Sequence, residues 1–319
     1  MQKTIRIGTR ESQLAVWQAT TVQNLLAKNG YLAELVYIKS DGDIDLKTPL
    51  YEMGVQGIFT RSLDVALLNN TIDIAVHSMK DVPTQLPKGI VQSAVLERAS
   101  FKDILVLKNP ETVVSCQLSV DGSNYQSSTI NHQLTIATSS IRRKAQWLHR
   151  YPTHTIENLR GNVNTRLKKV AESNWYGAIF AAAGLERINL RPENSIDLDW
   201  MLPAPAQGAI MVVCQENDRV CLDACQHFHD AGTALCTQIE REFLRALLGG
   251  CSTPISALAE IKNNTIHFRG NIVAVNGSAK IAIEKSVNIS EANELGYLAA
   301  QEILEQGGQA IVDTINHAK

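Results

Sequence analysis

The sequence lacks long apolar runs, is poor in aromatic residues, and carries none of the common nucleotide-binding patterns. No apolar run approaches the roughly 20 residues that a membrane-spanning helix needs, so we expect no membrane association. Aromatic residues make up 5% of the chain. No phosphate loop ending in Gly-Lys-Ser/Thr and no dinucleotide glycine fingerprint occurs, so the sequence gives no support for a nucleotide site.

The cysteines lack the regular spacing of a disulfide framework or of a standard zinc site. They are Cys116, Cys214, Cys221, Cys225, Cys236 and Cys251. The first residues lead directly into strand-like sequence without the apolar region of a signal peptide. These features predict a cytoplasmic protein with reduced thiols and no bound metal.

The chain as a whole has almost no net charge, but one segment is strongly positive. The net charge of −2 excludes a globally basic nucleic-acid binder. Between residues 135 and 170, however, there are eight Lys or Arg residues and one acid, Glu157. That local excess predicts an anionic partner. Because only Trp147 and Tyr151 are interleaved with these cations, single-stranded nucleic acid is disfavoured as that partner.

Strand-like and helix-like segments alternate along the first two thirds of the chain. We expect strands at residues 4–8, 34–39, 72–76, 134–140, 155–159, 178–182 and 209–214, and helices at 13–28, 58–69, from 141, at 163–171, and to about 232. The last part reads as a helix at 240–248, strands at 256–261, 265–275 and 279–288, and one helix at 291–306.

This order predicts two α/β domains with mixed, largely parallel sheets and a small C-terminal α+β domain. The chain leaves the first module near residue 100 and returns through the Pro-rich segment 202–208. We therefore expect domain 1 at 1–98 and 209–226, domain 2 at 102–202 and domain 3 at 231–319. Two α/β modules whose turns face each other form a cleft, the usual place for a ligand.

Polar turns follow the first strand of each α/β module and precede a helix. They are Thr9-Arg10-Glu11-Ser12 and Thr138-Ser139-Ser140. Backbone N–H groups at such helix starts attract anions. Arg142 and Arg143 lie just inside the second helix, where the helix dipole disfavours cations. Some cations of such a run must face water. Arg142 and Arg143, however, are well placed to bind an anion through bidentate guanidinium hydrogen bonds.

Lys80-Asp81 follows an apolar strand and precedes Val82-Pro83. An exposed Lys–Asp pair is the commonest outcome for such neighbours. A carboxylate at the mouth of a cleft is also what acid/base work or stabilisation of a cationic intermediate requires. Position in the sequence alone favours neither the exposed ion pair nor the functional carboxylate.

Gly249-Gly250-Cys251-Ser252-Thr253-Pro254 follows a periodic helix and precedes a strand. The two glycines free the backbone at the helix end, and the proline keeps the helix from resuming. The loop therefore displays the Cys251 thiol, which suits covalent chemistry. The alternative is that Cys251 is a small apolar filler.

Six motifs in this order resemble the porphobilinogen deaminase family, also called hydroxymethylbilane synthase, over essentially the whole chain. The matching residues are Ile7-Gly8-Thr9-Arg10-Glu11-Ser12, His77-Ser78-Met79-Lys80-Asp81-Val82-Pro83, Thr138-Ser139-Ser140-Ile141-Arg142-Arg143, Leu159-Arg160-Gly161-Asn162-Val163, Ala183-Gly184-Leu185 and Gly249-Gly250-Cys251. Each motif alone is weak, but the ordered set is specific.

The resemblance implies two domains like periplasmic binding proteins and a third domain that carries a dipyrromethane cofactor on Cys251 through a thioether. It implies a monomeric transferase of tetrapyrrole and haem biosynthesis. Such an enzyme condenses four porphobilinogen molecules with loss of ammonia and releases hydroxymethylbilane by hydrolysis. The basic segment suits pyrroles that carry acetate and propionate groups.

By matched position, the resemblance also implies roles for individual residues. Asp81 stabilises the cationic, azafulvene-like species that forms when ammonia leaves. Cofactor binding is implied for Cys251, Lys80, Asp81, Thr138, Ser139, Ser140, Arg142 and Arg143. Substrate binding is implied for Arg10, Ser12, Phe59, Arg160, Arg166, Arg187 and Gln207. No metal is implied.

The chain departs from the usual pattern of the family at three positions. Gln56 stands where a lysine is common, Asn164 replaces a glycine before Thr165, and Ala206 replaces a glycine before Gln207. The first departure puts a flexible cationic loop in doubt. Two alternatives differ in class: a non-catalytic anion-binding module, and a nucleic-acid binder that uses the basic segment and binds with strong salt dependence.

Overall fold

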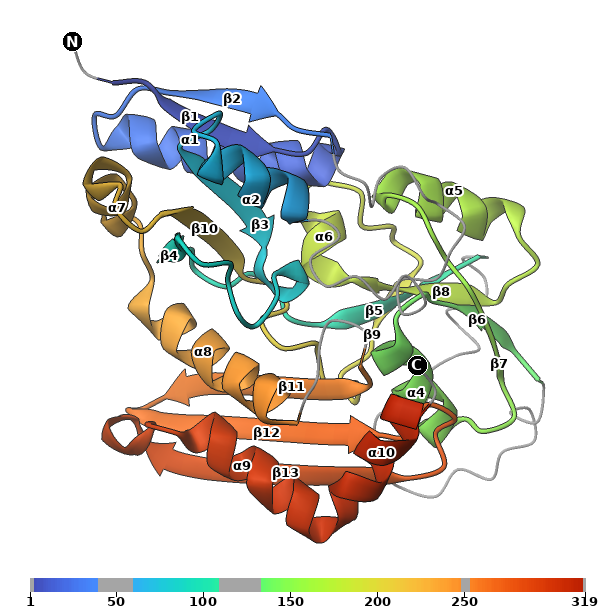
Figure 1. Cartoon of the computed structure of the whole chain (residues 1–319). Coiled ribbons are helices and arrows are strands. Elements are labelled where there is room, and N and C mark those ends of the chain that lie inside the picture. The colour runs from blue at the N-terminus through green and yellow to red at the C-terminus, as the bar shows by residue number, and fades with distance from the viewer. Residues whose placement is uncertain (1–2, 40–59, 109–132, 248–252, 318–319) are drawn as a thin grey trace.

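The computed structural model describes residues 3–39, 60–108, 133–247 and 253–317. These residues form three sheets, each with its own covering of helices (Figure 1). The first sheet lies at the top of the view, the second at the right and the third at the bottom. The core is divided accordingly, because each sheet buries its own apolar side chains.

The first sheet has five strands in the order β2-β1-β3-β10-β4. The strands are β1 (Ile5–Thr9), β2 (Ala33–Tyr37), β3 (Ile74–Ser78), β4 (Ile90–Val95) and β10 (Ile210–Gln215). Helices α1 (Gln13–Lys28) and α7 (Arg219–Gln226) cover one face, and α2 (Arg61–Leu68) covers the other. Strand alternation explains the two faces, since Ile74 and Val76 pack on the α1 side while Ala75 packs on the α2 side.

The second sheet repeats this plan in the order β7-β6-β8-β5-β9. Its strands are β5 (Asp103–Leu107), β6 (Thr135–Ala137), β7 (Thr155–Glu157), β8 (Gly177–Ala181) and β9 (Ser195–Asp197). Helices α5 (Val163–Glu172) and α6 (Ala182–Glu186) pack on one face, and α4 (Ile141–Arg150) packs on the other.

Both sheets are mixed and largely parallel, as expected. In each sheet four strands point in the same direction, and the fourth strand in the order, β10 or β5, is antiparallel to both neighbours. The reason is the chain path. β10 enters the first sheet only after the chain has traversed the second, so no βαβ crossover fixes its direction.

The third sheet is an antiparallel meander of β11 (Ile255–Lys262), β12 (Thr265–Val273) and β13 (Lys280–Asn288). Helices α8 (Ala231–Ala246), α9 (Leu295–Ile303) and α10 (Gln309–His317) contribute to its core. The expected helix at 240–248 begins earlier, at Ala231, because the Asp230 carboxylate accepts a hydrogen bond from Thr233 N at 2.6 Å and caps it.

Two other expected helix boundaries are wrong. The helix expected to reach about residue 232 ends at Gln226, where the chain turns toward the Asp230 cap. The helix expected at 291–306 begins later, as α9 at Leu295, and a second helix, α10, follows it after Gly307, whose φ of 100° breaks the regular path between them. The second of these, α10, was not predicted.

Candidate active site

A cavity of about 310 Å³ lies where the turns of the first two sheets meet the start of the third domain. It is lined by residues after β1 and β3 on one side, and by residues around the starts of α4, α5 and α6 on the other. The structure brings together nearly all the described residues that the sequence singled out. Those lining the cavity are Arg10, Ser12, Lys80, Asp81, Ser139, Ser140, Arg142, Arg143, Arg160, Arg166, Arg187 and Gln207.

Thr138 is the described site residue that does not line the cavity. Its side chain is buried, and its Oγ1 accepts a hydrogen bond from Ser140 N at 3.2 Å. Ser140 in turn caps α4 by accepting from Arg143 N at 3.4 Å. Ser12 caps α1 in the same way, accepting from Ala15 N. The polar turns therefore owe part of their sequence to helix capping.

Phe59, Gln56, Cys116 and Cys251 lie outside the described residues. The other four cysteines are buried in apolar surroundings, and burial raises the pKa of each thiol. They are Cys214, Cys221, Cys225 and Cys236. Among the described residues no three His, Cys, Asp or Glu side chains come together in a way that could hold a metal ion.

Lys80 and Asp81 belong to a single 3₁₀ turn, η2 (Met79–Asp81), directly after β3. Lys80 Nζ donates to Gln207 Oε1 at 3.1 Å. Burial, followed by repulsion from the Arg143 guanidinium, lowers the pKa of Lys80 to about 8. Lys80 is therefore a partly buried cation in the cavity rather than half of a solvated ion pair.

Asp81 differs from Lys80 in keeping its oxygens available. Within the four described ranges its carboxylate makes no hydrogen bond or ion pair, although its charge partly offsets the lowering of the pKa values of Lys80 and Arg166. It is also the one carboxylate among the described residues that line the cavity, where seven cations accompany it. An acceptor placed in this way can respond to positive charge that develops on a bound molecule.

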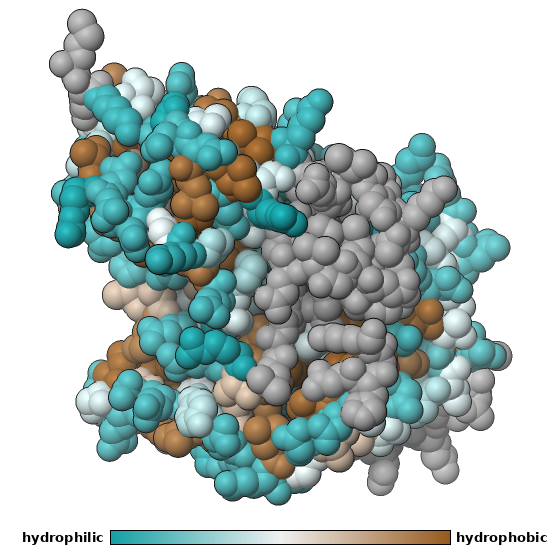
Figure 2. Space-filling model, in the orientation of Figure 1, coloured by the Kyte–Doolittle hydropathy of each residue, from teal (hydrophilic) through white to brown (hydrophobic). Residues whose placement is uncertain are grey.

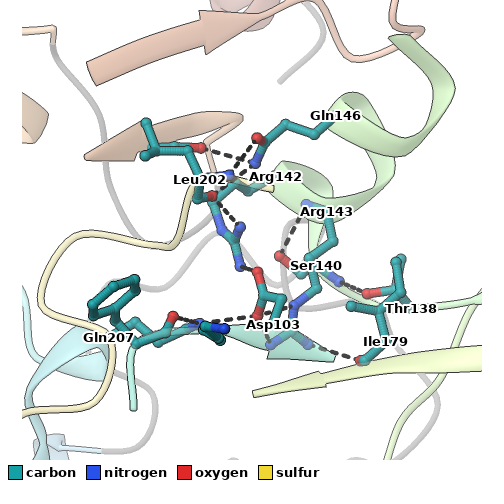
Figure 3. Close-up of polar contacts among 12 residues, drawn as sticks. Asp103, Thr138, Ser140, Arg142, Arg143, Gln146, Ile179, Leu202 and Gln207 are labelled. Atoms are coloured by element: carbon teal, nitrogen blue, oxygen red, sulfur yellow. Dashed lines mark hydrogen bonds and ion pairs between the residues drawn. The ribbon is translucent and has the colours of Figure 1, made fainter. Parts of the chain in front are cut away.

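Arg142 and Arg143 share a buried carboxylate that sequence reasoning missed, Asp103 at the start of β5 (Figure 3). Arg142 Nη2 lies 2.7 Å from Asp103 Oδ2, and Arg143 Nη2 lies 2.8 Å from Asp103 Oδ1. Burial alone would raise the pKa of Asp103, but the two guanidiniums and Lys80 together lower it to about 2. One ionised carboxylate thus allows two neighbouring guanidiniums to stay buried.

The two guanidiniums have limited capacity left for a ligand. Arg142 Nη1 donates to Leu202 O at 2.7 Å, and Arg143 Nη1 donates to Ile179 O at 2.9 Å. Arg142 Nε is buried and has no hydrogen-bond partner among the described residues. A buried donor left in this way is a place for a ligand acceptor.

Gln207 is also tied into this network, which joins residues far apart in the sequence (Figure 3). Its Nε2 donates to Phe101 O at 2.7 Å and to Asp103 Oδ1 at 2.9 Å, while its Oε1 accepts from Lys80. The Gln207 amide therefore bridges the Lys80 ammonium and the Asp103 carboxylate. This places Gln207 as a connector in the cavity wall, with its side chain already bonded on both ends.

Three further cations of the lining come from the second domain. Arg160 is 4% exposed. Burial and the charges of Arg143 and Arg160 lower the pKa of Arg166 to about 10. Arg187 Nη2 donates to Gly208 O at 2.7 Å, and its guanidinium lies over the Trp17 ring.

Contacts across the cavity mouth join the two α/β domains. Asn164 Nδ2 donates to Gln13 Oε1 at 3.0 Å, so a residue that departs from the family pattern bridges the halves. The other described departure, Ala206, directly precedes the cavity-lining Gln207, has a φ of 61° and is fully buried. A left-handed alanine costs about 1 kcal/mol, which explains why glycine suits that position.

The site as a whole is built to receive a molecule with several negative groups and to respond to one positive centre. Arginine forks match carboxylates, and those of Arg142, Arg143, Arg166 and Arg187 are held by backbone carbonyls that fix their direction. No helix in the described part of the chain is both long and apolar enough to cross a bilayer.

Comparison with known proteins gives a consistent result over the whole length of the chain. A family described as "Porphobilinogen deaminase, dipyromethane cofactor binding domain" matches residues 5–223, and "Porphobilinogen deaminase, C-terminal domain" matches residues 234–305. The porphobilinogen deaminase of Syntrophotalea carbinolica is 37% identical, covering 98% of this chain and 96% of its own. That of Chlorobium phaeobacteroides is 35% identical, covering 99% of both.

Among solved structures, a periplasmic substrate-binding protein of an ABC transporter from Coxiella burnetii is similar in outline. It covers 72% of this chain and 94% of its own, with a TM-score of 0.44 and 11% sequence identity. That likeness is too distant to argue from.

Proposed function

The chain belongs to the porphobilinogen deaminase family, and we propose that the cavity is its active site, with Asp81 as the catalytic residue. The enzyme condenses four porphobilinogen molecules head to tail onto a dipyrromethane cofactor, with release of ammonia. It then releases hydroxymethylbilane by hydrolysis. This is a transferase step of tetrapyrrole and haem biosynthesis.

The observation that carries the proposal is the charge pattern of the cavity, with one carboxylate among seven cations. Porphobilinogen brings carboxylates, which the cations attract. When the bond between its aminomethyl carbon and nitrogen breaks, ammonia leaves and the pyrrole becomes positively charged. Asp81, with its carboxylate unengaged by the described residues, stabilises that charge while a pyrrole carbon attacks.

The residues present fit a dipyrromethane. Its acetate and propionate groups require donors, and the cavity offers Lys80, Ser139, Arg142 and Arg143 for them, including the partnerless buried Nε of Arg142. Thr138 and Ser140 shape the turn that presents Ser139. When bound, the cofactor supplies the primer pyrrole to which the first substrate is joined. Attachment to Cys251 is part of the proposal and rests on the resemblance.

Substrate and the growing chain are assigned to the other residues of the lining. These contacts are proposed for Arg10, Ser12, Arg160, Arg166, Arg187 and Gln207, with Phe59 stacking on pyrroles. Since Gln207 already bonds Lys80 and Asp103, we assign it the task of setting the direction of Lys80. Burial of Arg160 suits a guanidinium that meets its carboxylate away from water.

The domain limits stay as proposed from the sequence: 1–98 with 209–226, 102–202, and 231–319. We further propose that the enzyme is a cytoplasmic monomer. In the face shown in Figure 2, hydrophilic side chains cover most of the described surface and apolar ones lie in small groups. Large apolar patches mark protein–protein interfaces, and the described part of this face carries none.

Intact mass spectrometry of active protein tests the proposal. We expect the polypeptide mass plus two porphobilinogen units, each less one ammonia, and we expect Cys251→Ala to lack that increment. One ammonia should be released per porphobilinogen consumed. Active protein with the bare polypeptide mass would refute the cofactor assignment. An anion-binding module would show neither increment nor ammonia, and a nucleic-acid binder would bind nucleic acid with steep salt dependence.

A further inference from the structure

Arg241, on helix α8 of the third domain, donates hydrogen bonds to the turn that carries the catalytic carboxylate. Its Nη1 donates to Val82 O at 2.9 Å and to Met79 O at 3.4 Å, and its Nη2 donates to Pro83 O at 2.6 Å. The three carbonyls flank Asp81 on both sides. One guanidinium therefore binds backbone carbonyls both before and after Asp81.

The contact joins parts of the molecule that are far apart in the sequence. Arg241 is separated from the 79–83 turn by about 160 residues and belongs to a different sheet. Figure 1 shows α8 on the side of the third sheet that faces the first domain. The same helix leads, ten residues after Arg241, to Cys251 in the sequence.

The turn has little internal support of its own. η2 is three residues long, and its regular closure is one hydrogen bond from Val82 N to Met79 O at 3.2 Å. Its entry is fixed by Met79 N, which donates to Ala209 O at 3.0 Å. The outward carbonyls need donors from elsewhere, because partly buried carbonyls are costly to leave unpaired. Arg241 supplies them.

We propose that Arg241 is a positioning residue for the reaction: by holding the Met79–Pro83 backbone it fixes where the Asp81 carboxylate stands in the cavity. This inference rests on the role proposed above for Asp81. It requires arginine in particular, since a planar fork reaches several carbonyls at once, whereas a lysine ammonium is a point charge on a flexible stem. Arg241 itself does not line the cavity and touches no reacting atom.

The experiment compares Arg241→Ala and Arg241→Lys with Arg269→Ala, a matched control. Arg269 is also in the third domain, but its guanidinium makes one partly exposed contact with Glu260 at 3.6 Å. For each variant, porphobilinogen consumption gives kcat and KM, intact mass gives the cofactor content, and thermal unfolding gives stability. Low-millimolar guanidinium chloride is then added, with urea at the same concentration as its uncharged counterpart.

We expect Arg241→Ala to keep its cofactor and to bind porphobilinogen with KM within about threefold of the parent. Its kcat should fall roughly 10- to 100-fold, the loss typical of a reactive group that is displaced by an ångström. Guanidinium, but not urea, should restore part of that kcat by filling the vacated place. The kcat of Arg241→Lys should lie between those of Arg241→Ala and the parent, and the kcat of Arg269→Ala should match that of the parent.

A kcat for Arg241→Ala within about threefold of the parent would overturn the inference. So would a loss of kcat that tracks lost cofactor or lost folded protein and does not respond to guanidinium, because that is a purely structural role. If Arg241→Ala does not fold, Arg241→Lys is read by the same criteria. Failure of the proposed function looks different: the parent would release no ammonia, or Asp81→Asn would be fully active.

Discussion

The two five-stranded sheets have the same strand order but contribute different chemistry to the cavity between them. In the first, β3 ends in η2 and presents Lys80 and Asp81. In the second, the equivalent strand β8 runs into α6, whose first residues are Ala182, Ala183 and Gly184. The fold repeats, yet the carboxylate of the cavity comes from one half.

The cations are distributed in the opposite sense. The first domain contributes two to the cavity lining and the second contributes five: Arg10 and Lys80, against Arg142, Arg143, Arg160, Arg166 and Arg187. The difference teaches that the halves divide the work. In the proposed function, the second domain holds the carboxylates of the bound pyrroles, and the first places the negative charge of Asp81 where positive charge develops.

The largest effect should follow when the negative charge of Asp81 is removed from the first domain. Asp81→Asn keeps the shape of the side chain, so the fold and the cofactor should remain. Turnover should fall by at least about 100-fold, the usual loss for a missing electrostatic partner. Steady-state porphobilinogen consumption measures it, with Asp199→Asn as the exposed control carboxylate. Near-normal turnover would remove Asp81 from its role.

The second half should be sensitive to its hidden carboxylate. Asp103→Asn leaves two buried guanidiniums with a neutral partner and should cost roughly 3–5 kcal/mol of unfolding free energy, read from urea midpoints at pH 7. Because the folded pKa of Asp103 is about 2 and its ordinary value is 3.8, its contribution is complete above pH 4 and is lost as pH falls toward 2. The variant should lack that acid-dependent loss; equal acid sensitivity would contradict the assignment.

Lys80 gives the comparison a pH dependence. Its pKa of about 8, lowered by burial and then by Arg143, means that the cation is lost as pH rises past 8. Since kcat/KM reports the free enzyme, it should decline above pH 8. Lys80→Gln should be less active throughout and lack that limb. The effect of Lys80 on stability has the opposite sign to its effect on kcat/KM. Between pH 8 and 10.5 the Lys80 side chain binds more protons in the unfolded state, so its contribution to the free energy of unfolding increases as pH rises.

The smallest effect should come from the bridge across the cavity mouth. The Gln13–Asn164 hydrogen bond is exposed, so its coupling free energy should be less than about 1 kcal/mol. A double-mutant cycle of Gln13→Ala and Asn164→Ala, followed by urea unfolding and turnover, measures it. A coupling of several kcal/mol would mean that the two halves depend on this contact far more than its exposure indicates.

The sequence could predict what local patterns encode. The strand–turn–helix units before α1 and α4 were predicted because the apolar period changes at a polar turn. That Ser12 and Ser140 cap these helices emerged only from the structure. The cavity residues were predicted from motifs that the chain brings together at strand ends. Asp103 was missed because its partners lie 39 and 40 residues away, and no local spacing reports a pairing over that distance.

Helix ends were the least predictable part of the fold. Whether Asp230 starts a helix depends on its side chain reaching Thr233 N, which competes with continuing the preceding helix. Arg241 is a similar case, because a helix pattern cannot show that one of its cations meets carbonyls of another domain. In both, contacts formed only in the folded protein decide the outcome.

The division of work between the halves is tested most directly by intact mass at intervals after porphobilinogen is added to Asp81→Asn and Arg143→Ala. We predict that Asp81→Asn carries the cofactor mass but gains porphobilinogen units at least about 100-fold more slowly than the parent. Arg143→Ala should carry little cofactor or stall early in extension. Extension of Asp81→Asn at the parent's rate, or a fully loaded and fully active Arg143→Ala, would contradict the account.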